Sequence, residues 1–316
     1  MHLESIGLNN FKNYESLKID FSKEINCLVG KNGSGKTNLL DAIYYLCITK
    51  SAFNPQDVQC ALHVVLIAPN DTDVIRNGSE DRRRFFDGII SQTSQSYLND
   101  LIQYNHVLKQ RNSLLKQFAD RDFFDAALLQ QYTDQLIEIG QRIYEVRKGF
   151  TQAFRPLVQK HYALLSEESE QVDLQYESDF GHDIAALFKQ NQKKDLILKR
   201  TNVGIHKDEF LFEMEGELIK KFGSQGQQKS YLIALKLAHF DYIFTETEIK
   251  PMLLLDDIFD KLDDFRITKL MEMVASDAFG QIFVTDARPE RSQKIFEAIG
   301  HEVKFFEVEG GEIEAK

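Results

Sequence analysis

One octapeptide near the start of the chain constrains its fold more than any other feature. Residues 30–37 read Gly-x-x-x-x-Gly-Lys-Thr, the pattern of a phosphate-binding P-loop. An apolar run at residues 25–29 precedes the loop, and apolar residues at helical spacing follow it. Strand, glycine-rich loop and helix is the order that anion binding needs, because backbone N–H groups and a helix N-terminus then surround the phosphates. We therefore expect a nucleotide site at Gly30, Lys31, Asn32, Gly33, Ser34, Gly35, Lys36 and Thr37.

Two side chains of the loop have separate expected roles. Lys36 is expected to neutralise β- and γ-phosphate oxygens, and the Thr37 hydroxyl to ligate Mg²⁺. A GTPase is not favoured, because the chain has no Asn-Lys-x-Asp motif for base recognition.

Composition limits the class of protein. The chain has 316 residues, of which 43% are hydrophobic, enough for one or two domains. It has no apolar run long enough to span a bilayer, no signal peptide at its start and only three scattered cysteines, so we expect a cytoplasmic location. The net charge of −11 argues against strong unaided DNA binding, although a local basic patch on an acidic body is compatible with it.

The pattern of apolar residues predicts an α/β protein with a helical insertion. Three strands precede the helix after the P-loop, and residues 64–68 form another strand candidate. From residue 95 to 157, apolar residues, among them Leu136, Ile143 and Val146, recur at the spacings of three and four that a heptad repeat has. Asn105 and Asn112 are polar members of this repeat and could fix its register. A short connector, with Asp125 as N-cap, predicts an antiparallel helical hairpin, either in an ordinary bundle or in a short projecting arm. We expect an ATPase lobe at residues 1–87 and 200–316 and a helical lobe at residues 88–199.

A second chemical motif lies near the C-terminus. Residues 252–257 form an apolar run that ends in Asp256 and Asp257, the Walker B pattern. Asp256 is expected to hold Mg²⁺, and Asp257 to orient or deprotonate the attacking water. A further core strand ends in Thr285 and Asp286, whose hydroxyl or carboxylate can contact the γ-phosphate or its water.

The most discriminating motif is Ser224-Gln225-Gly226-Gln227, which opens a helix about thirty residues before Walker B. It resembles the signature motif of ABC-type ATPases, and residues 258–263 resemble their D-loop, with Asp263 as the acidic residue. In that class the signature closes over ATP bound by a partner chain. The resemblance therefore implies an ABC-type head, with a mixed sheet flanked by helices, that dimerises around two ATP molecules.

The chain resembles the RecF family, recombination-mediator ATPases of the SMC-like branch of ABC proteins. The resemblance is carried by residues 8–14, 31–38, 68–71, 82–87, 204–208, 222–229 and 255–263. It implies an ATP-dependent homodimer on DNA at single-strand/double-strand junctions and in gapped duplexes. It also implies weak, DNA-stimulated ATP hydrolysis and cooperation with RecO and RecR to load RecA, with no membrane partner.

Some features depart from this resemblance or leave alternatives open. Between Cys60 and Val64 the family has several tens of residues of β structure, whereas this chain has three. The consecutive arginines Arg82, Arg83 and Arg84 could contact phosphates or pair with nearby carboxylates. Two other functions are considered, an SMC-type structural head and a transporter ATPase subunit. The helical hairpin is too short to favour an SMC-type head. The helical insertion and the absence of a switch histidine do not favour a transporter subunit.

Overall fold

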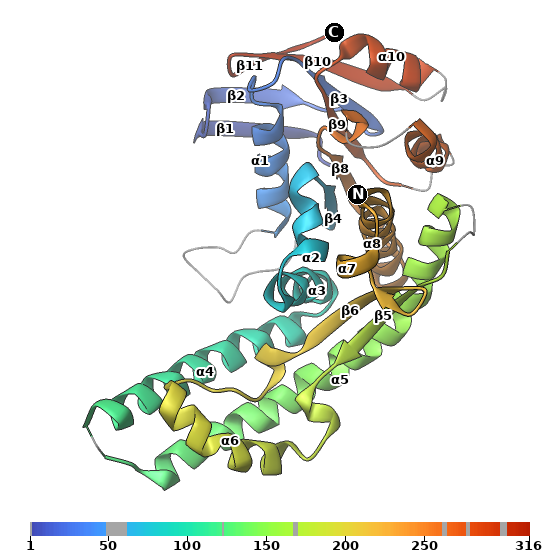
Figure 1. Ribbon diagram of the computed structural model, residues 1–316. Helices are drawn as coiled ribbons and strands as arrows, with labels where there is room; N and C mark the ends of the chain where they lie inside the picture. Colours follow the sequence, from blue (N-terminus) through green and yellow to red (C-terminus); the bar gives the residue numbers. More distant parts are fainter. Residues whose placement is uncertain are drawn as a thin grey trace. The chain divides into compact units, whose positions relative to one another are not determined.

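The computed structural model describes residues 2–48, 62–121, 123–166, 170–260, 264–275, 279–297 and 302–316 (Figure 1). The chain forms two compact units, one of residues 1–72, 157–170 and 224–316 and the other of residues 73–156 and 171–223. The first unit contains β1 (Ser5–Phe11), β2 (Tyr14–Asp20), β3 (Ile25–Val29), α1 (Lys36–Ile48), β4 (Val64–Ile67), α8 (Gln225–Thr247), β8 (Met252–Leu255), α9 (Asp264–Ala275), β9 (Ile282–Asp286), α10 (Pro289–Glu297), β10 (Val303–Glu309) and β11 (Glu312–Ala315).

A six-stranded sheet forms the centre of the first unit. Its strand order is β11-β10-β3-β9-β8-β4, and all neighbours are parallel except the terminal hairpin of β10 and β11. Every residue of β3, β8 and β9 is buried, as expected for strands covered on both faces. Because parallel strands end at the same edge, the residues that follow β3 and β8 are brought together with the end of β9.

Apolar side chains of this sheet, of α1 and of the β1–β2 hairpin form one core. Leu28, Leu39 and Phe283 are fully buried in it. The two cysteines in the described residues, Cys27 and Cys47, are buried, and neither forms a disulfide. This core holds the loop after β3 and the start of α1 in fixed relation to the sheet.

The second unit combines a three-stranded antiparallel sheet with long helices. It contains α2 (Asp73–Arg76), α3 (Ser79–Thr93), α4 (Gln95–Arg121), α5 (Ala126–Ser166, up to residue 156), β5 (Val172–Glu177), α6 (Ile184–Leu198), β6 (Glu209–Met214), β7 (Glu217–Leu218) and α7 (Ile219–Phe222). The sheet order is β5-β6-β7. Phe86 of α3 packs against Phe210 of β6, with 4.3 Å between ring centroids, so aromatic contacts join helices and sheet.

The predicted helical hairpin is present, and its register is visible in three contacts between α4 and α5. Tyr97 contacts Arg147, Asp100 contacts Arg142 and Arg111 contacts Thr133. As the residue number increases along α4, the number of the contacted residue in α5 decreases, so the two helices are antiparallel (Figure 1). As predicted, Asp125 caps α5, because its carboxylate accepts a hydrogen bond of 3.0 Å from the Leu128 N–H.

The buried stripe of the hairpin differs in part from the predicted heptad positions. On α5, Leu136 and Ile143 are buried as expected, but Val146 is 38% exposed and Arg147 is buried in its place. On α4, Asn105 is exposed, so it does not fix the register. A straight α-helix of 3.6 residues per turn drifts away from a strict 3.5-residue repeat, which moves the inward face to neighbouring positions.

Two buried arginines organise the second unit. Arg147 forms ion pairs with Asp87 at 2.9 Å and with Asp208 at 2.7 Å. Arg111 pairs with Asp195 at 2.8 Å. All five charges lie in or beside the interior, where an ion pair must be well hydrogen-bonded to offset the loss of hydration.

The compact units divide the chain at other residues than the sequence patterns suggest. Residues 73–87 and 200–223, expected in the ATPase lobe, belong to the second unit, and residues 157–166 of α5 belong to the first. The cause is local packing, because α3 contacts α4 and β6 and β6 pairs with β5. The expected shortening between Cys60 and Val64 falls largely on residues 49–61, which lie outside the described residues.

Candidate nucleotide-binding site

The loop at residues 30–35 joins the buried strand β3 to helix α1, as the sequence predicts. Two of its glycines cannot be replaced without a clash. A Cβ atom at Gly35 would lie 2.3 Å from Asn13 Nδ2, and one at Gly30 would lie 2.3 Å from the Val308 carbonyl oxygen. Gly35 also has a φ of 116°, which side chains disfavour. The loop therefore owes its shape to glycine at both ends.

Lys36 and Thr37 occupy the first turn of α1. The Lys36 ammonium, only 4% exposed, donates to the carbonyl oxygens of Gly30 at 2.7 Å and Lys31 at 2.9 Å. These contacts hold the cation inside the curl of the loop. A cation and a helix N-terminus at one place create a favourable position for phosphate.

A chain of polar contacts links the loop to the ends of β8 and β9. The Thr37 hydroxyl donates to Asp256 at 3.0 Å, and the Thr285 hydroxyl donates to the same carboxylate at 2.8 Å. The Asp257 N–H donates to the Thr285 oxygen at 2.9 Å. Asp257 has a φ of 44°, a left-handed conformation that aspartate tolerates better than most residues. Thr285 thus fixes both Walker B aspartates.

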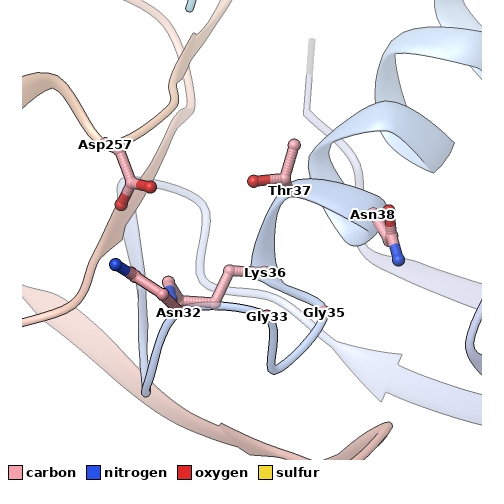
Figure 2. A pocket seen from close by; sticks show the side chains of 7 residues that line it. All are labelled: Asn32, Gly33, Gly35, Lys36, Thr37, Asn38 and Asp257. Carbon is pink, nitrogen blue, oxygen red and sulfur yellow. The ribbon is translucent and has the colours of Figure 1, made fainter. Parts of the chain in front are cut away.

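A pocket of about 160 Å³ opens at this place, between the loop and Asp257. Figure 2 shows the Asp257 carboxylate, which follows β8, facing the loop. The lining residues are Asn32, Gly33, Gly35, Lys36, Thr37, Asn38 and Asp257. The Thr37 hydroxyl and Asp256 carboxylate beside it are hard oxygen donors of the kind that Mg²⁺ prefers, so these residues fit a magnesium ion whose other ligands are phosphates and water.

The turn between β1 and β2 supports the loop, which sequence reasoning missed. The Tyr14 hydroxyl donates to the Gly35 carbonyl at 2.9 Å, and burial raises the pKa of Tyr14 to about 12. Asn38 Nδ2 donates to Asn13 Oδ1 at 2.6 Å. The polar run at residues 9–14 was a visible signal, but nothing in its pattern says which segment it contacts.

Asp286 has a different place from the one expected near the γ-phosphate. Its buried carboxylate accepts from Ser292 Oγ at 2.5 Å, from the Arg288 N–H at 3.1 Å and from Arg291. These bonds tie the end of β9 to the start of α10, and Asp286 does not line the pocket that the structure describes. Its role is structural in this geometry.

The signature residues begin helix α8. Ser224 is the N-cap of a capping box: its hydroxyl accepts from the Gln227 N–H, and the Gln227 side chain accepts from the Ser224 N–H. Glu170 fixes Gln227 further, because its carboxylate accepts from Gln227 Nε2 at 2.6 Å and from the Tyr162 hydroxyl at 2.5 Å. Ser224 and Gln225 are exposed, and Gly226 is half-buried. None of these residues belongs to the described lining of the P-loop pocket, and the D-loop residue Asp263 lies outside the described residues.

The three consecutive arginines have separate environments in the second unit. Arg82 is buried and pairs with Glu209 at 2.8 Å. Arg83 Nη1 donates to the Asp208 carbonyl at 2.6 Å. Arg84 is 73% exposed and pairs with Glu80. Arg82 therefore pairs with a carboxylate, the structural alternative, whereas the hydrogen bond of Arg83 goes to a carbonyl oxygen.

Comparison with known proteins decides the family. The model of a family described as AAA ATPase domain matches residues 1–251. The DNA replication and repair protein RecF of Cytophaga hutchinsonii is 42% identical over 364 positions, which cover 99% of this chain and 97% of the relative. The chain belongs to the RecF family. It is therefore a member of a family of ATPase-domain proteins of DNA replication and repair.

Solved structures show the same fold in a RecF protein. The recombination mediator protein RecF–ATPrS of the RecFOR pathway superposes with a TM-score of 0.88 at 24% identity, over 99% of this chain and 98% of the other. An Smc head domain from Pyrococcus furiosus gives a TM-score of 0.52 at 17% identity, over 99% of this chain and 95% of the other. The predicted ABC-type head with a helical insertion is thus confirmed as a fold shared with RecF and, more distantly, with SMC heads.

The alignment with the Cytophaga RecF also bears on chain length. It extends over 364 positions, 48 more than the 316 residues present here, so the relative contains residues that this RecF-family chain lacks. Their location between Cys60 and Val64 stays a prediction. No helix in the described part of the chain combines the length and apolar character needed to cross a bilayer.

Proposed function

We propose that the chain is an ATP-driven clamp in DNA repair and replication, in which two copies enclose two ATP molecules. The observation that carries the proposal is that the signature residues are not part of the described P-loop pocket of the same chain. The P-loop pocket is lined by the loop, α1 and Asp257, whereas Ser224 and Gln225 are exposed at the start of α8 and are not among its described lining residues. A second copy can supply the missing wall, because a helix N-terminus with a free edge attracts phosphate.

Within one copy, the proposed roles follow the contacts of each side chain. Residues 30–37 surround the phosphates, and Lys36 neutralises their β- and γ-oxygens. Thr37 and Asp256 would hold Mg²⁺, which supplies charge stabilisation to the phosphates when bound. Asp257 orients or deprotonates the attacking water, and Thr285 holds both aspartates in place through its hydroxyl.

Across the dimer, Ser224, Gln225, Gly226 and Gln227 close over the γ-phosphate held by the partner copy, and Asp263 of the D-loop lies at the same interface. Hydrolysis then reopens the clamp. Asp257 is one methylene shorter than the glutamate common in ABC proteins, which supports slow hydrolysis that resets a dimer. We further propose that DNA stimulates this weak activity.

The cellular role that we propose follows the family. RecF relatives are DNA replication and repair proteins, and the superposed structure is described within a RecFOR pathway. We infer that this chain binds gapped DNA at single-strand/double-strand junctions and works with RecO and RecR to load RecA. An SMC-type structural head is the second candidate, supported by the distant fold likeness.

Sedimentation velocity tests the clamp. We expect the wild type to be monomeric without nucleotide and dimeric with ATP, and the Asp257→Asn chain to stay dimeric because attack on ATP is slowed. Ser224→Arg should still bind ATP but remain monomeric. Ser96→Arg, at an exposed serine of the second unit, is the control and should dimerise. A Ser224→Arg chain that dimerises with ATP as well as the wild type would contradict the shared site.

A further inference from the structure

A dense group of cations lies on the second unit of an otherwise acidic chain. Residues 189–200, which cover the end of α6, contain five lysines and arginines and a single acidic residue, Asp195. The Asp195 side chain is fully buried and pairs with Arg111 inside the unit. Its charge is thus used within the interior, so the surface of this segment is strongly positive although the whole chain carries −11.

The neighbouring turn at residues 205–207 adds Lys207 to this group of cations. His206 Nδ1 lies 3.0 Å from the Tyr104 hydroxyl, and His206 Nε2 lies 3.2 Å from the Thr201 carbonyl oxygen. Both ring nitrogens are therefore engaged, and the turn at residues 205–207 is held against the segment that follows α6. Arg83 reaches the same turn through its hydrogen bond to the Asp208 carbonyl.

These cations repel one another. Burial, and after it the positive charges of Arg200, Arg83 and Lys194, lower the pKa of Lys207, while the Asp195 carboxylate acts in the opposite direction. Lys194, Arg200 and Lys207 are exposed, and none of them has a carboxylate within the 4.0 Å of an ion pair among the residues that the structure describes. Lys199 in contrast pairs with Asp120 at 2.7 Å. The Asp195 carboxylate offsets this repulsion only in part, because the pKa of Lys207 stays lowered.

We propose that Arg83, Lys194, Arg200 and Lys207, here called the cationic face, bind the phosphate backbone of a nucleic acid. The proposal rests on the DNA-binding function proposed above and locates that binding on the second unit, apart from the nucleotide pocket. Ammonium and guanidinium groups contact phosphates without reading bases, so binding is independent of sequence. A polyanion removes the repulsion and releases its own counterions, which makes binding strongly salt-dependent.

The test is the salt dependence of binding to a gapped duplex oligonucleotide, measured by fluorescence anisotropy on the full chain with ATP. We compare the wild type with the triple variant Lys194→Gln, Arg200→Gln, Lys207→Gln. Because each phosphate contact contributes about 0.9 to the slope of log K against log salt on duplex DNA, the slope should fall by roughly 2–3 per chain. Affinity at low salt should fall about a hundredfold.

The matched control removes three other exposed cations of the same unit, each paired with a carboxylate. Arg84, Arg142 and Arg155 contact Glu80, Asp100 and Asp173, and their change to Gln should leave the slope unchanged. The single variants Lys194→Gln and Arg200→Gln, each expected to lower the slope by about 0.9, keep the test valid if the triple variant does not fold.

Three outcomes would overturn the cationic face. The triple and both single variants could keep the wild-type slope, the control could lose as much slope, or the wild type could bind no DNA. Polyglutamate is a further probe: if it binds more tightly than DNA and the triple change removes only that binding, an acidic protein occupies the face instead. Dimerisation with ATP is measured on the same samples. If the triple variant has a smaller slope than the wild type, but the wild type never dimerises with ATP, the clamp is contradicted and the cationic face is supported.

Discussion

The two units of the molecule use charge in opposite ways. Of the 38 lysines and arginines and 49 acidic residues, the second unit holds 20 and 21, and the first therefore holds 18 and 28. Nearly all of the net charge of −11 thus belongs to the first unit. Two of its buried charges, Lys36 and Asp256, lie in or beside the phosphate pocket, whereas Asp286 binds residues of α10. The buried arginines of the second unit, Arg111 and Arg147, instead pair with carboxylates inside the fold.

A buried charge therefore serves one of two purposes in this protein, ligand binding or folding. At Lys36 and Asp256 it prepares a site for an anionic ligand, and removing the charge should affect ligand binding more than folding. At Arg111 and Arg147 it replaces part of an apolar core, and removing the charge should affect folding more than ligand binding. Variants of each kind test this distinction.

The largest effect is expected at Arg147. Arg147→Met leaves Asp87 and Asp208 without their buried partner, which should lower the free energy of unfolding by about 3–5 kcal/mol. Urea unfolding measures this change, and ATP affinity of the folded fraction should stay unchanged. The exposed Arg84 is the matched control, and Arg84→Met should change stability by about 0.5 kcal/mol at most. Equal losses in the two variants would contradict a structural role for burial of Arg147.

Lys36→Ala is the complementary change in the first unit. It removes the cation held inside the P-loop, and ATP affinity should fall by roughly 10²–10³-fold, as for loss of one strong oxyanion contact. Thermal unfolding without nucleotide should be little altered. Lys23→Ala, at an exposed lysine of the same unit, should bind ATP normally. Nucleotide titration of a Lys36→Ala chain that shows wild-type affinity would remove Lys36 from the site.

Acid should destabilise the second unit through His206. Burial lowers the pKa of His206 to about 4, so the folded state binds fewer protons than the unfolded state at intermediate pH. Stability is therefore fully present above the unfolded pKa of about 6.5 and is lost as pH falls toward 4. Urea unfolding at pH 7.5 and 5 should show a loss of about 2 kcal/mol more in the wild type than in His206→Asn. An identical loss in both chains would refute this contribution.

The smallest effect is expected at Tyr14. Tyr14→Phe removes the hydrogen bond from the hydroxyl to the Gly35 carbonyl, which should cost about 1 kcal/mol and weaken ATP binding several-fold. Tyr45→Phe, at a tyrosine that is 56% exposed, is the control. If both variants bind ATP equally well, the β1–β2 turn does not shape the P-loop.

The sequence predicted the first unit better than the second, for a physical reason. The P-loop, the apolar run before Asp256 and the N-cap Ser224 are local patterns, and local geometry alone determines them. Arg147 is different, because an arginine between apolar residues reads as surface until its partners Asp87 and Asp208, far away in the chain, are known. The predicted heptad therefore chose Val146 as a buried position, one residue from the correct one.

Long-range contacts also explain the other differences within the site. Asp286 ends a core strand, as predicted, but the arginine and serine of α10 that bind its carboxylate are identified only once α10 is placed. Asn13 and Tyr14 lie 21 residues before Ser34 and Gly35, the loop residues that they contact. Chemistry that depends on one motif was accessible from the sequence, whereas chemistry that depends on packing between segments was not.

A mixing experiment tests the shared site most directly. A Lys36→Ala chain lacks an ATP pocket but keeps its signature, and a Ser224→Arg chain keeps its pocket but lacks the signature. Neither should dimerise with ATP alone. Mixed in equal amounts, they should form a heterodimer in sedimentation, because the signature of the first closes over ATP in the second. If the mixture sediments as monomers while wild-type chains dimerise with ATP, the site is not shared between copies in the way proposed here.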